Sequence, residues 1–120
     1  MKTILAAVLA ATIATAACAQ DVKPSSVAVV NKDKTLLVGK SVQVKGKVVK
    51  VNNGIMGRNF VHVQDGTGIA ADGTNNLIVT SKDTANVGET VTATGVVTLN
   101  RDFGMGYMYP LLLEETRISK

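Results

Sequence analysis

The sequence predicts an all-β fold, and three of its features indicate it. Apolar and polar residues alternate over short segments, most clearly from Val42 to Lys47, as on strands with one buried face. Valine, leucine and isoleucine supply most of the apolar bulk, because the 120 residues include no tryptophan, two phenylalanines and two tyrosines. After the first twenty residues, no segment has the 3.6-residue apolar period of a substantial helix.

Five strands are predicted in the C-terminal two thirds of the chain. They cover, in order, residues 41–52, 59–64, 77–80, 90–99 and 107–118. The first is long, and its alternation changes phase around Gly46 to Val48, which indicates a β-bulge and a bend. Asp65-Gly66-Thr67-Gly68 predicts a turn after the second strand, and Val87-Gly88-Glu89 predicts another before the fourth.

Residues 21–37 leave more than one structure open. Pro24-Ser25-Ser26 is typical of a linker, Val27 to Val30 suit a short added strand, and Thr35 to Val38 suit one helical turn. We therefore divide the chain into a signal peptide (1–19), an N-terminal extension (20–38) and a β domain (39–120).

The first nineteen residues are predicted to be a cleaved export signal. Lys2 precedes an apolar run over residues 4–17, and Ala17-Cys18-Ala19 has the small-x-small pattern of a cleavage site. The run is too short to span a bilayer and no second run of about 18 apolar residues follows, so no transmembrane segment is expected. Cleavage before Cys18 with lipidation is the alternative, although Thr15 stands where such signals usually have leucine. Cleavage after residue 19 is favoured, and it predicts a periplasmic or secreted protein.

Charge and cysteine content limit which partners and which reactions the chain could have. The whole chain carries a formal net charge of +4, and loss of Lys2 with the signal leaves 12 basic and 9 acidic residues, or +3. This mild excess weakly favours an anionic partner, although lysines on a solvated strand face explain it equally well. Cys18 is the sole cysteine, so a domain cleaved after residue 19 has neither disulfides nor thiolate chemistry.

Two segments resemble a known group of proteins. Residues 39–48 (GKSVQVKGKV) and 60–68 (FVHVQDGTG) are similar to the opening of bacterial OB-fold proteins. With VGETVTATGVV and RDFGMGYMYP, the chain resembles, over residues 36–118, small exported OB-fold proteins found beside periplasmic cytochrome c nitrite reductases or attached to multihaem cytochromes. The resemblance implies a five-stranded Greek-key OB-fold barrel, whereas the strand pattern alone also permits an SH3-like barrel or a small sandwich. It further implies a periplasmic protein partner such as a multihaem cytochrome, and it implies little about activity.

Two loops predict the candidate site. An OB-fold grips its ligand with the loop between strands one and two and the loop between strands four and five. Here both loops, 52–58 and 100–106, contain glycines, one arginine and one methionine. The candidate ligand- or partner-binding residues are Met56, Arg58, Phe60, His62, Arg101, Phe103, Met105 and Tyr107. The alternative is that the apolar loop side chains plug the ends of the barrel.

The sequence offers no catalytic constellation. His62, the only histidine, is predicted to lie with Phe60 on the strand face opposite Val61 and Val63, where a packing role is favoured over that of a general base or ligand. No serine lies in a nucleophile elbow, and Asp65 is better explained as a turn residue. We therefore predict no enzymatic activity and no cofactor.

Three functions remain in order of preference. The first is a non-enzymatic, exported binding or accessory module. The alternative is binding of single-stranded nucleic acid, with Phe60, Phe103 and Tyr107 as stacking residues, against which export and the small charge count. The third is copper binding through methionine sulfur, for which the chain lacks a clustered methionine motif, so that no metal site is predicted. Its donors would be Met56, Met105, Met108 and His62.

Overall fold

The computed structural model describes residues 22–104, 106 and 108–120. The predicted signal peptide with Cys18, and the candidate site residues Met105 and Tyr107, lie outside the described residues. The strands are β1 (Lys23–Ser25), β2 (Ser41–Ile55), β3 (Arg58–Gln64), β4 (Leu77–Ser81), β5 (Thr90–Asp102) and β6 (Met108–Ser119). The helices are α1 (Val27–Lys32), α2 (Lys34–Leu37) and a 3₁₀ turn, Ala70–Asp72.

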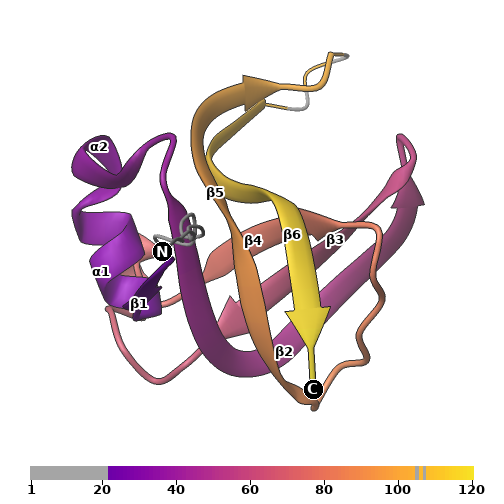
Figure 1. The fold of residues 1–120 in the computed structure, drawn as a ribbon, viewed down its shortest axis with the longest axis horizontal. Helices are drawn as coiled ribbons and strands as arrows, with labels where there is room; N and C mark the ends of the chain where they lie inside the picture. Colours follow the sequence, from indigo (N-terminus) through magenta and orange to yellow (C-terminus); the bar gives the residue numbers. More distant parts are fainter. Residues whose placement is uncertain (1–21, 105, 107) are drawn as a thin grey trace, which may run out of the picture.

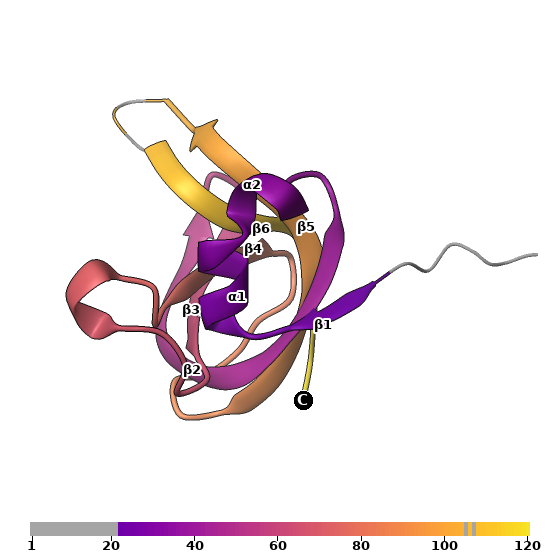
Figure 2. The same ribbon diagram turned by 90° about the vertical axis from the view of Figure 1, so that its left-hand side faces the viewer.

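Strands β2 to β6 pair in a closed ring (Figures 1 and 2). The sheet order is β1-β2-β3-β4-β6-β5, and β5 pairs back onto β2. The β4–β6 pairing is parallel, whereas β2–β3, β3–β4, β5–β6 and β2–β5 are antiparallel. The all-β prediction is confirmed, and the ring agrees with the predicted barrel of five strands. Near their connection, β5 and β6 continue as a two-stranded arm that projects from the ring (Figure 1).

The long strand β2 belongs to both halves of the ring, as predicted. Its first half pairs with β5, and its second half pairs with β3. Gly46 lies at the changeover, where a Cβ atom would stand 2.6 Å from Val63 Cγ1 and 2.8 Å from the carbonyl oxygen of Gln64. The glycine is therefore needed for close approach of β3 to the bend. The predicted position of the bulge was wrong, because buried positions alternate unbroken through Val48 and the register shift follows, between Val48 and Lys50.

The N-terminal extension differs from two of the predictions. Pro24 and Ser25 belong to a sixth strand, β1, which pairs in parallel with β2, so they are not a linker. Val27 to Val30 form helix α1 rather than a strand. The Ser26 side chain caps this helix by accepting from the Val29 N–H, and Asp65 of the predicted turn accepts from the Val27 N–H at 3.0 Å. The predicted helical turn near Thr35 is confirmed as α2.

The main core lies inside the ring, and α1 and α2 cover one end of it (Figure 2). Because β2 to β5 alternate, one face of each supplies apolar side chains to this core, and the extension contributes three more. The buried members are Val27, Val30, Leu37, Val42, Val44, Val48, Val61, Val63, Leu77, Val79, Ala85, Val91, Ala93, Val97 and Leu113. Within the described part of the chain, no helix is long and apolar enough to cross a membrane.

Candidate functional site

The β2–β3 hairpin ends in a two-residue turn, Met56-Gly57. Both residues have positive φ, 52° and 78°, and Ile55 pairs with Arg58 across the turn. Such turns favour Asn-Gly, and the left-handed conformation costs other residues roughly 1–2 kcal/mol. A methionine here is therefore not explained by turn chemistry. Its side chain is 46% exposed.

The structure brings the two predicted loops together around Phe103. The guanidinium carbon of Arg58, at the start of β3, lies 5.2 Å from the centroid of the Phe103 ring. That of Arg101, near the end of β5, lies 4.7 Å from it. Both distances fall within the range of cation–π attraction. The half-buried aromatic ring is thus held by one arginine from each hairpin.

Beneath Phe103 lies an aromatic floor of Phe60 and Tyr109. The ring centroids are separated by 5.5 Å for Phe60 and Phe103, 5.3 Å for Phe60 and Tyr109, and 5.8 Å for Phe103 and Tyr109. Phe60 does lie opposite Val61 and Val63, outside the main core, but it is only 1% exposed. Phe60, predicted as a binding and stacking residue, is therefore covered by Phe103 and Tyr109 of the β5–β6 arm and presents no open face to a ligand.

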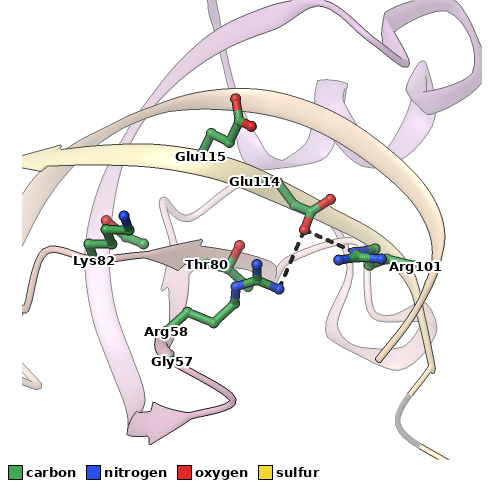
Figure 3. Close-up of a pocket in the computed structure, with 8 residues that line it drawn as sticks. Gly57, Arg58, Thr80, Lys82, Arg101, Glu114 and Glu115 are labelled. Carbon is green, nitrogen blue, oxygen red and sulfur yellow. Dashed lines mark hydrogen bonds and ion pairs between the residues drawn. The ribbon is translucent and has the colours of Figure 1, made fainter. Parts of the chain in front are cut away.

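Sequence reasoning missed Glu114, which joins the two arginines. Its Oε2 accepts from Arg101 Nε at 3.1 Å and lies 4.0 Å from Arg58 Nη1 (Figure 3). Glu114 precedes Glu115, whose φ is 52°, at an irregularity in β6 where its pairing with β5 and β4 changes register. Bulges of this kind redirect side chains next to functional sites. Strict alternation of β6 gave no indication of the contact. Tyr109, which pairs with Arg101 across β5 and β6, was also missed.

A pocket of about 280 Å³ opens beside these side chains. It is a mixed-charge site with three cationic and two anionic side chains in its wall. Its lining residues are Gly57, Arg58, Thr80, Ser81, Lys82, Arg101, Glu114 and Glu115. The backbone of β4 and the buried Thr80 and Ser81 form a rigid base, since Thr80 Oγ1 and Ser81 Oγ donate to carbonyl oxygens of β6.

His62 does not take part in this pocket. Its Nδ1 lies 3.3 Å from Asn76 Nδ2, and Lys50 stands opposite it on β2. Partial burial, and secondarily the charge of Lys50, lower the pKa of His62 below its usual value. The described residues contain no group of three or more His, Cys, Asp or Glu side chains placed to hold a metal ion. Of the methionines in the copper hypothesis, Met56 and Met108 are exposed at the hairpin ends, and Met105 lies outside the described residues.

The lowered pKa of His62 predicts a pH dependence of stability. Because the unfolded chain binds the proton more readily than the folded one, the free energy of unfolding should fall as pH drops from about 6.5 through the folded-state pKa. His62→Gln should remove this slope. Urea unfolding between pH 7.5 and 5 measures it, and an NMR titration of the imidazole with a midpoint at or above 6.5 would contradict it.

No protein-family model and no curated protein matches this chain. Similar folds occur among solved structures. A Leishmania major Friedlin protein assigned as an aspartyl-tRNA synthetase matches 91% of this chain with a TM-score of 0.55 and 12% identity. Entamoeba histolytica asparaginyl-tRNA synthetase, in complex with asparaginyl-adenylate, matches 81% with a TM-score of 0.53 and 15% identity. The match covers 22% and 23% of those chains, so the likeness concerns the fold of one part of each.

Proposed function

We propose that this domain is an OB-fold binding module whose ligand is single-stranded nucleic acid. The observation that carries the proposal is Phe103, a half-buried ring beside the guanidinium groups of both Arg58 and Arg101, where the two ligand-binding loops of such a barrel meet. Proteins that bind single strands combine cationic side chains, which contact phosphates, with aromatic rings on which bases stack. The fold likeness to parts of two tRNA synthetases favours the same ligand class.

Basic residues on β2 add a weak electrostatic contribution. Lys45, Lys47 and Lys50 are exposed along this strand, and Lys45 and Lys47 line a second hollow of about 500 Å³. With a net charge near +3 for residues 20–120, such a surface attracts a polyanion without fixing its sequence. We therefore expect weak, salt-sensitive binding with little sequence preference.

We propose no catalytic role for this domain. His62 faces an amide and a lysine rather than a carboxylate that would orient it as a general base. In the described part of the chain, the pocket wall combines arginine, lysine, glutamate and two hydroxyls that donate to backbone carbonyls. This arrangement suits the binding of an anion and provides no activated nucleophile.

Arg101→Ala should lower affinity for a deoxythymidine oligomer about tenfold, and Arg58→Ala somewhat less. Each loses a phosphate contact, so the slope of log affinity against log salt should fall by about 1. Fluorescence anisotropy with a labelled oligomer at low salt, repeated at increasing salt, measures both quantities. Unfolding temperatures should stay within a few degrees, because the two side chains are 34% and 40% exposed and neither belongs to the core.

Arg117→Ala is the matched control, since it removes the same charge from an exposed position outside the pocket. It should change affinity less than twofold, as expected for a charge that contacts no phosphate. Equal losses for Arg101→Ala and Arg117→Ala would show that binding is a diffuse charge effect and would refute the site. Absence of any binding by the natural chain at low salt would refute nucleic acid as the ligand.

A second candidate function is supported by the exposed methionines. Met56 and Met108 are 46% and 58% exposed at the ends of the two hairpins, beside the arginines. Apolar, adaptable side chains next to arginine are typical of protein-binding surfaces. These side chains support an accessory module that binds another protein. The predicted export signal would make that partner a periplasmic protein, such as a multihaem cytochrome. Immobilised protein should then capture a partner from periplasmic extract, and the double variant Met56→Ser/Met108→Ser should lose it.

A further inference from the structure

The geometry points to a phosphate-sized anion site between Arg58, Lys82 and Arg101 that Glu114 occupies as an internal competitor. The inference deepens the proposed function and rests on it for the biological ligand, which would be a nucleotide phosphate. The anion site itself is inferred from the contacts of these side chains and does not depend on nucleic acid being the ligand.

The two arginines retain donors that Glu114 does not use. A guanidinium has five N–H donors in a planar fork. Glu114 uses one of its oxygens, Oε2, for one nitrogen of each fork, at 3.1 Å from Arg101 Nε and 4.0 Å from Arg58 Nη1. Among the described residues, Glu114 is the only carboxylate paired with either arginine. One carboxylate thus bridges two cations without bidentate geometry to either.

A phosphate would match this pocket better than the glutamate does. Three cationic and two anionic side chains line it, so its wall keeps one net positive charge even with Glu114 in place. Phosphate offers several oxygens and up to two negative charges, so it can accept from both forks at once. The volume of about 280 Å³ admits a phosphate with part of an attached nucleoside.

The irregularity in β6 gives this competitor its position and also provides a control. Successive residues of a regular strand point to opposite faces. Glu114 is directed at the arginines, whereas Glu115 is directed away from them (Figure 3). The two residues carry the same charge in the same segment, and only Glu114 has to move when an anion binds. Glu114→Gln and Glu115→Gln each remove one negative charge from the pocket wall, but only Glu114→Gln frees arginine donors.

Isothermal titration calorimetry of the full chain with inorganic pyrophosphate tests the inference. Glu114→Gln should bind at least ten times more tightly than the natural chain. Glu115→Gln, which removes a wall charge that contacts neither arginine, should gain much less, and Glu114→Gln/Arg101→Ala should lose the gain. Glu114→Asp has a shorter side chain that withdraws the charge without removing it. Its affinity for pyrophosphate should lie between those of the natural chain and Glu114→Gln. It also serves as the test should Glu114→Gln fail to fold. Equal affinity for the two glutamine variants, or weaker binding by Glu114→Gln, would overturn the inference.

A parallel titration with the deoxythymidine oligomer separates this inference from the proposed function. If Glu114→Gln gains affinity for pyrophosphate while neither protein binds the oligomer, the anion site stands and nucleic acid is the wrong ligand. If the oligomer binds through Arg101 and Glu114→Gln changes neither affinity, the proposed function stands and the competitor is refuted.

Discussion

Phe60→Ala is expected to lower the free energy of unfolding by about 3 kcal/mol, the cost of removing a buried phenyl ring and leaving a cavity. The ring is 1% exposed and contacts both Phe103 and Tyr109. Its loss therefore also removes the packing that supports the Phe103 ring. Urea denaturation followed by circular dichroism measures the change. Because a small domain has only about 5–15 kcal/mol of stability, this variant should be visibly destabilised.

Phe60→Leu and Phe103→Ala are the controls for this prediction. Leucine fills most of the volume and should cost about 1 kcal/mol. Phe103 is half-buried at the surface of the site, so Phe103→Ala should reduce ligand binding more than stability. A Phe60→Ala variant as stable as Phe103→Ala would show that the β5–β6 arm does not cover Phe60 in solution.

Gly46→Ala is expected to cost about 2–3 kcal/mol, although it adds a single methyl group. The new Cβ would stand 2.6 Å from Val63 Cγ1 and 2.8 Å from the Gln64 carbonyl oxygen, and the latter belongs to a paired backbone that cannot move freely. The midpoint of urea unfolding measures the loss.

Lys47→Ala, at the next and exposed position of the same strand, should stay within about 0.5 kcal/mol of the natural chain. If Gly46→Ala were equally neutral, β3 would not pack against the bend of β2 as closely as the structure shows.

The fold could be predicted from the sequence where one physical rule dominated. Alternating valines located the strands to within a few residues, because burial of one face decides the conformation of such segments. For Val27 to Val30 the prediction of a strand was wrong. β-branched residues favour strands, but helix α1 begins at a cap from Ser26 and at a hydrogen bond from the Val27 N–H to Asp65, which is distant in sequence. The bulge was misplaced because Gly46 serves close packing rather than a change of phase.

The candidate site could be predicted only in part. Its loop residues Arg58, Arg101 and Phe103 were found because the two loops share glycines, one arginine and one methionine, and the second adds an aromatic residue. Glu114 was not found, since an irregularity that turns a strand residue toward a distant loop leaves no periodic trace. The burial of Phe60 was not predicted, because it requires β5 and β6 to stay paired as far as Asp102 and Met108. That length depends on pairing between the strands and not on the pattern of either strand alone.

The double pairing of β2 has a consequence for how the chain reaches its native state. Gln43 and Thr94 lie 51 positions apart in the chain, yet they are partners in the segment that closes the ring. Contacts of such long range slow folding, because the loop entropy is lost before the contact energy is gained. Hairpin β2–β3 carries Arg58 and hairpin β5–β6 carries Arg101 and Glu114. The two hairpins are joined through β4 and through the β2–β5 pairing, so the proposed anion site assembles only when strands distant in the chain have paired. Recovery of ligand binding in a refolding experiment should therefore report these long-range strand pairings.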